Sequence, residues 1–391
     1  MLKEISRLLN KKESELNKWY KEKLSLGNKC FYTSVDIRYC GNKLVPIDTN
    51  LFPAGFNNLN EDNIEQASKL TKEYITNISP NCKNILIIGE DHTRNLHYLD
   101  NLKTIENIIT QAGYTCKIGS LNSTEEMNLN GISYKDINII PLIKEDNLLK
   151  TTDGFQPDLI ILNNDLMLGE HEKLKNIKQN IIPSPYNGWF KRRKSKHFEI
   201  YNKLMDELEE KFSLPSHIFT AEFSICSDLD FKSRQGIEKL AVEAEILLKK
   251  IKEKYIKHNI NNEPYIVIKS NYGTYGMGVM SIKSADEVLK LNKKFRQQMH
   301  ITKHNIVNNE VILQEGIKTI DIVNNSSAEP MLYLMNHQLV SFLFRSHDAK
   351  DEYSNLNSVG MKISNHKLDY NEYHQCCEFI SRIATLAAAL E

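Results

Sequence analysis

A lysine and a group of glycines beyond the middle of the chain have the residue types of a phosphate-binding loop. Lys269 ends an apolar run that starts at Tyr265, and a second apolar run covers Val279–Ile282. Glycines let backbone N–H groups approach an anion closely, and a lysine adds a compact positive charge. The pattern predicts two strands joined by a loop over a polyphosphate, with these loop residues: Gly273, Thr274, Tyr275, Gly276 and Gly278.

The glycine pattern by itself leaves more than one interpretation open. The dinucleotide-binding fingerprint needs a helix after the glycines, whereas Val279–Ile282 is typical of a strand. The Walker pattern ends in Gly-Lys-Ser/Thr, and protein kinases carry His-Arg-Asp and Asp-Phe-Gly segments, none of which occurs in the sequence. An ordinary hairpin remains open, and so does a nucleotide site in which a hairpin loop covers the phosphates.

Three oxygen-bearing side chains lie on another predicted hairpin, near the start of the chain. Asp36 lies on one strand, while Asp48 and Asn50 lie two residues apart at the end of the other and face the same side of the sheet. A turn at Gly41 and Asn42 can bring Asp36 near that side. Two carboxylates and an amide oxygen suit Mg²⁺, which prefers a few carboxylates together with phosphate oxygens. The alternative is two surface acids on an ordinary hairpin.

Further polar groups extend the candidate site. The segment Leu51–Leu59 has the features of a pocket wall, because it combines a glycine with the amides Asn57 and Asn58, and an ordinary structured loop is the equal alternative. The basic run Lys191–Lys196 suits phosphates or an anionic substrate, although such a run more often forms a solvated surface.

The order of predicted elements indicates a mixed α/β protein. Helices are expected over 2–26 and 61–78, and strands alternate with a helix between 84 and 182, which predicts an open lobe with a mostly parallel sheet. Ligands favour the carboxyl ends of such strands, here residues 90–94 and 163–165. Proline-rich residues 183–188 mark a boundary. The predicted divisions are 1–80 with the metal-binding hairpin, 81–186 as the α/β substrate lobe and 187–391 as the nucleotide-binding region.

Composition narrows the class of protein. The chain of 391 residues is long enough for two or three domains, and its 50 basic and 50 acidic residues leave no net charge that would favour nucleic acid or membrane binding. Seven cysteines without a Cys-x-x-Cys pair indicate neither a zinc site nor a disulfide framework. No signal-peptide core or membrane-length apolar run occurs, so we expect a cytoplasmic protein.

The order of the motifs resembles the ATP-grasp ligases. In that family a lysine and a mobile glycine loop hold the phosphates, and a strand acid–amide pair lies by the adenine and ribose. An arginine meets the transferred phosphoryl group, and an Asn-rich loop contacts phosphate or substrate. The resemblance implies Gly316 and Ile317 as further nucleotide contacts. The residues that carry it are Lys269, Gln314, Glu315, Arg345, Asn355 and Asn357.

The candidate metal ligands occupy an unusual place for this family. ATP-grasp proteins normally carry an Asp and a Glu-x-Asn segment after the last loop, where this chain predicts a final helix over 370–390. The matching residues are Asp36 and Asp48–Asn50, near the front. The chain therefore resembles a circularly permuted ATP-grasp domain with an inserted lobe, as in eukaryotic glutathione synthetase. Asp48 stands where the family more often has Glu, so its carboxylate reaches one methylene less.

A closer resemblance, over nearly the whole chain, is to the proteobacterial ATP-grasp type of glutamate–cysteine ligase. The segment 46–59 matches, and its part Asp48–Leu59 is specific, whereas the glycine loop is much less so. Ser270 and Asn271 depart from the Ala-Asp that we expect after the lysine. The other matching segments are 34–38, 188–198, 273–280 and 355–361.

This resemblance implies an ATP-dependent ligase that activates the γ-carboxylate of L-glutamate as an acyl phosphate. The amine of L-cysteine would then attack, giving γ-glutamylcysteine in the first step of glutathione biosynthesis. ATP and Mg²⁺ are the implied cofactors, with Lys269, Arg345, Asn355 and Asn357 as catalytic residues. The candidate substrate contacts are Arg38, Asn57, Asn58, Arg192, Arg193 and Lys196.

Three other functions stay open. Another ATP-grasp amide ligase, such as a glutathione synthetase, would carry the same ATP and metal motifs. A nucleic-acid-binding protein would use residues 189–197, but zero net charge and the lack of interleaved aromatic residues disfavour it. A catalytically inactive ATP-binding regulator would be free to lose residues such as Lys269 and Arg345, which are intact. The oligomeric state also stays open, with a homo-oligomer among the options.

Overall fold

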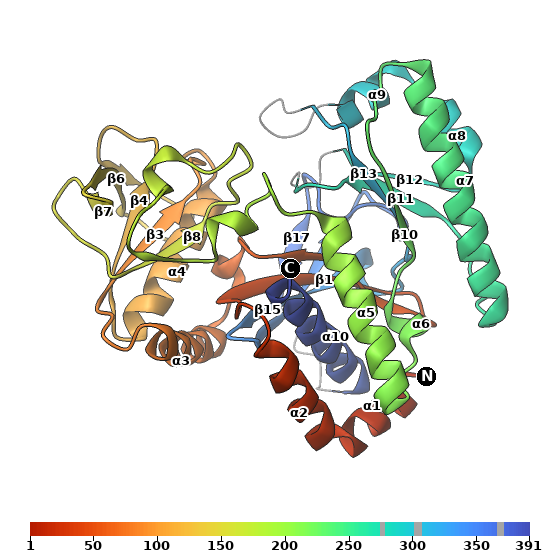
Figure 1. Ribbon diagram of the computed structural model, residues 1–391, viewed down its shortest axis with the longest axis horizontal. Helices are drawn as coiled ribbons and strands as arrows, with labels where there is room; N and C mark the ends of the chain where they lie inside the picture. Colours follow the sequence, from red (N-terminus) through yellow and green to blue (C-terminus); the bar gives the residue numbers. More distant parts are fainter. Residues whose placement is uncertain (274–277, 301–306, 366–370) are drawn as a thin grey trace.

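The chain folds around three β-sheets in the residues that the computed structural model describes, namely 1–273, 278–300, 307–365 and 371–391. A central sheet lies between an α/β lobe and a third sheet that is covered by helices (Figure 1). This mixed α/β organisation confirms the predicted fold class, whereas the circular permutation and the domain boundaries stay predictions.

The central sheet is antiparallel and joins the two ends of the chain. The predicted front hairpin forms, with Gly41 at a φ of 91° in its turn, and β1 pairs with β15 from the late part of the chain. In sheet order the strands are β17 (Lys362–Ser364), β16 (Gln338–His347), β15 (Ser326–Met335), β1 (Tyr32–Tyr39) and β2 (Leu44–Asn50), and β14 (Ile322–Val323) pairs with β15.

Helices cover one face of the central sheet. Val35 and Ile37 of β1 pack with Ile380 and the buried thiols Cys376 and Cys377. The predicted helix over 2–26 is two helices. The helices on this face are α1 (Leu2–Lys11), α2 (Glu13–Leu24), α5 (Lys194–Phe212), α6 (Ser216–Phe219) and α10 (Glu372–Ala389).

The α/β lobe packs on the opposite face, through Tyr32, Met331 and Tyr333 of the central sheet. Its parallel core has β3 beside both β4 and β8, so the chain crosses from one side of β3 to the other. The antiparallel strands β5 and β7 were not predicted. The elements are α3 (Glu61–Ile78), β3 (Asn84–Gly89), α4 (Leu96–Gln111), β4 (Thr115–Ser120), β5 (Met127–Leu129), β6 (Ile137–Glu145), β7 (Leu148–Thr151), β8 (Leu159–Asn163) and β9 (Asn180–Ile182).

The third sheet carries the predicted strand–loop–strand unit. Ile268 pairs with Met280 across β11 and β12, so the glycine loop joins two antiparallel strands, as predicted. Helix α7 covers the sheet, and two short helices follow β12. The elements are β10 (Phe223–Cys226), α7 (Arg234–Lys257), β11 (Ile266–Ser270), β12 (Met280–Ile282), α8 (Ala285–Leu289), α9 (Lys293–His300) and β13 (Val311–Glu315), with the strand order β10-β13-β11-β12.

The helices are not of a kind that spans a membrane: none in the described part of the chain is both long enough and apolar enough to cross a bilayer.

Candidate active site

A cavity of about 560 Å³ lies where the three sheets meet, and residues from all three line it. Most of the predicted site residues belong to its lining, although they come from segments up to 321 residues apart. These lining residues are Asp36, Arg38, Asp48, Asn50, Asn57, Asn58, Lys269, Gly273, Gln314, Glu315, Ile317, Arg345, Asn355 and Asn357.

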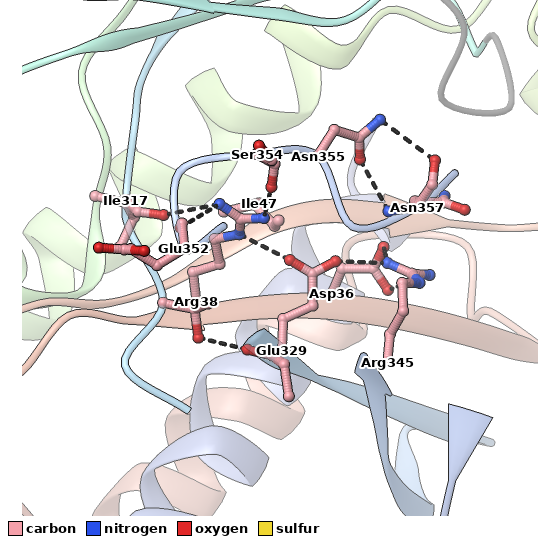
Figure 2. Close-up of polar contacts among 12 residues, drawn as sticks. Asp36, Arg38, Ile47, Ile317, Glu329, Arg345, Glu352, Ser354, Asn355 and Asn357 are labelled. Carbon is pink, nitrogen blue, oxygen red and sulfur yellow. Dashed lines mark hydrogen bonds and ion pairs between the residues drawn. The ribbon is translucent and has the colours of Figure 1, made fainter. Parts of the chain in front are cut away.

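Four buried charges from the central sheet form the floor of the cavity, and we call Asp36, Arg38, Glu329 and Arg345 the floor cluster (Figure 2). Arg345 Nη1 lies 2.7 Å from Asp36 Oδ2 and 2.8 Å from Glu329 Oε1. Arg38 Nε lies 2.7 Å from Glu329 Oε2. Every acid in the cluster is therefore paired with at least one guanidinium, the group best suited to such buried contacts.

Strand pairing explains why these charges meet. Glu329 on β15 is the cross-strand neighbour of Arg345 on β16, and Asp36 on β1 lies opposite Met331, two residues further along β15. Side chains two apart on a strand share a face. Glu329 was not predicted as a site residue; its only sequence signal is an acid within an otherwise apolar strand.

Burial and neighbouring charges shift the two acids of the floor in opposite directions. Burial, with Glu329 and Asp48 nearby, raises the pKa of Asp36 despite the attraction of Arg345. Burial also opposes ionisation of Glu329, but Arg38 and Arg345 outweigh it and lower the pKa of that carboxyl. The floor thus pairs two carboxylates with two guanidinium groups, and desolvation is the largest cause of the raised pKa of Asp36.

The second candidate metal carboxylate lies directly beside the floor. Asp48 is the cross-strand neighbour of Asp36, as the hairpin prediction requires, and Asn50 lies opposite Ser34. Asp48 forms an ion pair with Lys194, the first residue of α5. Burial opposes its ionisation, but Lys194 and Lys269 hold the pKa of Asp48 well below its ordinary value.

We tested whether these residues fit a divalent metal. Within the described parts of the chain, no three His, Cys, Asp or Glu side chains come close enough to hold a metal ion by themselves. Asp36, Asp48 and Asn50 do offer hard oxygen atoms on one side of one cavity. This set fits Mg²⁺, which is held by one or two carboxylates and completes its shell with phosphate oxygens and water.

Lys269 is the last residue but one of β11, and it lines the cavity. Its Nζ donates to the Ile47 carbonyl at 2.8 Å and lies 5.4 Å from the centre of the Phe198 ring. Burial, together with repulsion by Lys194, lowers the pKa of Lys269 to about 7. An arriving phosphate would restore its positive charge.

The described end of the glycine loop lies flat on an indole ring. A Cβ added at Gly273 would lie 2.0 Å from Trp189 Nε1, so only glycine fits there without movement. The Lys194 ammonium lies 4.8 Å from the centre of the same ring. Gly278 has a φ of 64° and does not line the cavity. The predicted contacts Thr274, Tyr275 and Gly276 lie outside the described residues.

The strand pair at the predicted nucleotide end has two different environments. Gln314 Nε2 is buried without a hydrogen-bond partner among the described residues, so it has a donor to offer a ligand. The Glu315 carboxylate pairs with Lys43 Nζ at 2.5 Å and accepts from the Glu222 backbone N–H at 2.9 Å. These two contacts hold the end of β13 in place, because Glu315 is its last residue.

The two residues after this pair also differ. Gly316 lies outside the main cavity, and an added Cβ there would be 2.1 Å from the Tyr265 ring. Ile317 lines the cavity, and its carbonyl accepts from Arg38 Nη1 at 3.2 Å.

Arg38 also ties the late polar loop to the floor. Its Nη2 donates to the Ser354 carbonyl at 2.5 Å, and its Nη1 donates to the Glu352 carbonyl at 3.3 Å (Figure 2). This contact places Asn355 and Asn357 over the cavity, where the Asn355 Oδ1 accepts from the Asn357 backbone N–H at 3.0 Å.

The predicted pocket wall forms at the end of β2. Gly55 has a φ of 103°, and an added Cβ would lie 2.4 Å from the Tyr333 hydroxyl. Its backbone N–H donates to Asn101 Oδ1 at 2.9 Å, which fixes the loop to the α/β lobe. Asn57 and Asn58 follow in a 3₁₀ turn and line the cavity.

The basic run places one residue in the site, and it is none of the three that were predicted. Lys194 lines the cavity, whereas Arg192, Arg193 and Lys196 do not. Arg192 pairs with Glu391 at 2.7 Å, Arg193 with Glu310 at 3.3 Å and Lys196 with Glu199 at 3.5 Å. Arg192 and Arg193 precede α5, whereas Lys196 lies two residues after Lys194 on the helix and faces a different direction, because each helical residue turns the chain by about 100°.

The carboxyl ends of two lobe strands reach the cavity, as predicted for residues 90–94 and 163–165. The cavity wall on this side is made by His92, Asn95, His97, Tyr98 and Asp165. Only the strand-end rule pointed to this region from the sequence, so it identified the segment and not the individual side chains.

Comparison with known proteins identifies the family of the chain. The glutamate–cysteine ligase family model matches residues 6–391. The crystal structure of a protein provisionally named gamma-glutamylcysteine synthetase, from Methylobacillus flagellatus KT, is similar with a TM-score of 0.91 and 34% sequence identity, and the match covers 100% of this chain and 95% of that chain. A search of curated proteins gives no significant match.

Two more distant structures share little beyond general organisation. A glutathione synthetase-like effector from Globodera pallida is 10% identical with a TM-score of 0.39, covering 89% of this chain and 83% of that chain. D-alanyl-alanine synthetase A from Vibrio cholerae is 8% identical with a TM-score of 0.37, covering 77% and 79%. Neither score is high enough to support an argument. The family model, in contrast, matches almost the whole sequence, and the chain therefore belongs to the glutamate–cysteine ligase family.

Proposed function

We propose that this ligase uses ATP to phosphorylate the γ-carboxylate of L-glutamate and then joins the acyl group to the amine of L-cysteine, giving γ-glutamylcysteine for glutathione biosynthesis. The observation that carries the proposal is the floor cluster, a buried set of paired acids and arginines in the same cavity as Lys269 and Gly273. Such a site can neutralise a polyphosphate and a carboxylate side by side.

Fixed positive charges would favour the phosphoryl transfer step. Arg345 is held by two carboxylates and Lys269 by the Ile47 carbonyl, so neither side chain has to reorganise during the reaction. Groups that are prepositioned in this way stabilise developing charge, and removing one typically costs about 3 kcal/mol in the transition state. Lys194 is another cation of the lining and would act with them.

Asp36, Asp48 and Asn50 would hold the Mg²⁺ of the nucleotide. Glu329 would affect the charge at that site through Arg345, which pairs with both Glu329 and Asp36. A bound Mg²⁺ would supply charge neutralisation at the phosphate oxygens. The ion pairs of Asp36 with Arg345 and of Asp48 with Lys194 keep both carboxylates oriented toward the cavity side of the sheet.

The residues that would contact glutamate line the cavity outside the floor cluster. Asn57 and Asn58 from the pocket wall, with Asn355 and Asn357 from the late loop, offer amide groups for its α-carboxylate and ammonium. Arg38 would act mainly by holding the late loop in place, because its guanidinium already contacts three backbone carbonyls. Arg192, Arg193 and Lys196 would influence glutamate binding only from outside the cavity.

A cytoplasmic location is part of the proposal. All seven cysteines are free thiols, and free thiols are typical of a reducing compartment.

Phosphate release by the purified protein tests the proposal. With ATP and Mg²⁺, release should require both L-glutamate and L-cysteine, and the product should have the mass of γ-glutamylcysteine. Release that needs γ-glutamylcysteine and glycine instead would make the protein a glutathione synthetase. Lack of release with every amino acid pair would overturn the proposed reaction.

A further inference from the structure

The lobe side of the cavity differs in charge from the floor. Its five lining residues are two histidines, an asparagine, a tyrosine and Asp165, and the described part of the lobe contributes no lysine or arginine to the lining. The floor and the third sheet contribute Arg38, Arg345 and Lys269 to the same lining. A cationic group entering the cavity therefore finds its favourable surroundings on the lobe side.

An acid–histidine pair is built into this wall. His92 Nε2 lies 2.6 Å from Glu90 Oε2; the Glu90 side chain is 9% exposed, whereas that of His92 is 36% exposed. A carboxylate in this position orients an imidazole and stabilises its protonated form. The pair therefore has the parts of a general base, with the imidazole at the cavity and the acid behind it.

Contacts from neighbouring elements hold the pair in place. The Glu90 backbone N–H donates to the Tyr98 hydroxyl at 2.9 Å, and that hydroxyl donates to the Asn163 carbonyl at 2.6 Å. The His92 ring meets the Tyr98 ring edge to face, with ring centres 5.6 Å apart. The end of β3, the start of α4 and the end of β8 thus all fix the position of His92.

Asp165 connects the same wall to the glycine loop. Its side-chain Oδ1 accepts from the Met167 backbone N–H at 3.2 Å, and its backbone carbonyl accepts from the Trp189 N–H at 2.8 Å. Trp189 in turn packs on Gly273. The acid is therefore held at a fixed distance from the loop that would cover the phosphates.

This wall lies where an open α/β sheet ordinarily binds ligands. The chain leaves β3 toward β4 on one side and later returns to β8 on the other, and the carboxyl ends of β3 and β8 lead into Glu90 and Asp165. A crevice forms at such a switch point because the two connections diverge.

We propose that the lobe wall binds the amine substrate, with Asp165 holding its ammonium group and His92, oriented by Glu90, acting as the base that activates it. The inference rests on the proposed function. An α-amino group is protonated near neutral pH and cannot attack until it loses a proton.

The step balances as follows. The His92 imidazole takes one proton from the ammonium and becomes an imidazolium. The neutral amine nitrogen attacks the acyl carbon of the glutamyl phosphate, a C–N bond forms and the C–O bond to phosphate breaks. The second proton of the nitrogen leaves with the phosphate as HPO₄²⁻, and the imidazolium later returns its proton to water.

Hydroxylamine separates this role from glutamate activation, because it is a nucleophile that is unprotonated at neutral pH and needs no base. His92→Gln should lower cysteine ligation by about 100-fold or more, the usual contribution of a general base. The same variant should form γ-glutamylhydroxamate from ATP, glutamate and hydroxylamine within about threefold of the unchanged enzyme. His171→Gln is the matched control, since His171 lies on the same lobe outside the cavity and contacts Asn122.

Two further variants test the parts of the wall separately. Asp165→Asn should raise the KM for cysteine more than it lowers kcat, and it should leave hydroxamate formation nearly unchanged. Glu90→Gln should lower kcat for cysteine ligation more than it changes the KM for cysteine, because the imidazole loses the carboxylate that orients it, and it should leave hydroxamate formation nearly unchanged.

Equal loss of ligation and hydroxamate formation in both His92→Gln and Asp165→Asn would overturn the inference, as would unchanged cysteine ligation in His92→Gln. An unchanged enzyme that makes neither γ-glutamylcysteine nor γ-glutamylhydroxamate would instead overturn the proposed function.

Discussion

The floor and the lobe wall of one cavity differ in the charged side chains that they present. The floor cluster is a set of alternating acids and arginines, in which each acid has a guanidinium partner at 2.8 Å or less. The lobe wall offers Asp165 and the Glu90–His92 pair without a lining lysine or arginine among its described residues. The first arrangement suits anions and a metal, whereas the second suits an ammonium group. Our two proposals accordingly place the two halves of the reaction on these two sides of the cavity.

The largest effect should come from breaking the floor. Arg345→Met leaves Asp36 and Glu329 buried without that guanidinium, and removing one partner of a buried ion pair typically costs about 3–5 kcal/mol. We expect a lower free energy of unfolding in urea together with a loss of turnover. Arg234→Met is the control, because the Arg234–Glu238 pair has similar geometry with the arginine side chain 92% exposed, and it should change little.

Asp48→Asn tests the metal assignment at the edge of the floor. The amide keeps the shape and one oxygen ligand but loses the charge that Mg²⁺ and Lys194 require, so turnover should fall by about 100-fold or more while the fold persists. The measurement is phosphate release with saturating Mg²⁺, glutamate and cysteine. Asp153→Asn, on the lobe surface beside Lys117, serves as the control. Near-normal turnover of Asp48→Asn would show that the metal lies elsewhere.

Gly273→Ala tests the junction between the loop and the wall. The new methyl would lie 2.0 Å from Trp189 Nε1, so the loop or the indole must move. We expect about a tenfold rise in the KM for ATP, of the size that small misplacements of binding groups produce. Adding Trp189→Phe to this variant should recover part of the loss, since the smaller ring makes room. A double variant that is worse than Gly273→Ala would argue against steric contact as the cause.

The pH dependence of ATP binding should show the smallest effect. Lys269 has a pKa of about 7 because burial and Lys194 disfavour its charge, so it is protonated below that pH and largely neutral above it. Bound phosphate favours the charged form and raises the pKa, so ATP binding should take up at most one proton at about pH 8 and weaken by about fivefold between pH 7 and 8. Calorimetry in buffers of different ionisation enthalpy measures this uptake. Lys269→Arg should abolish it, because arginine stays charged.

Much of the fold and part of the site could be predicted from the sequence because the signals are local. Alternation along two strands places Asp36, Asp48 and Asn50 together, and the structure shows that register directly. The apolar runs around the glycines likewise predict the pairing of β11 with β12. A turn residue or a strand period acts over a few residues and needs no knowledge of the rest of the chain.

The parts that sequence reasoning missed depend on distant pairing or on helix phase. Glu329 meets Asp36 only because β15 pairs with β1 across nearly 300 residues, and no local pattern encodes that register. Lys194 enters the cavity, and its basic neighbours do not, because α5 begins at that residue. The strand-end rule indicated the region of His92 and Asp165, but their approach to the floor depends on how the lobe packs on the central sheet.

Isotope transfer tests the central claim most directly, namely that the floor activates a carboxylate before the amine reacts. The enzyme would be supplied with ATP, Mg²⁺, cysteine and glutamate labelled with ¹⁸O in its γ-carboxylate. The ¹⁸O content of the released phosphate would then be measured by mass spectrometry. An acyl phosphate requires that one labelled oxygen pass to the phosphate in every turnover. Formation of γ-glutamylcysteine with unlabelled phosphate would contradict the account, because the carboxylate oxygen would then never have bonded to phosphorus.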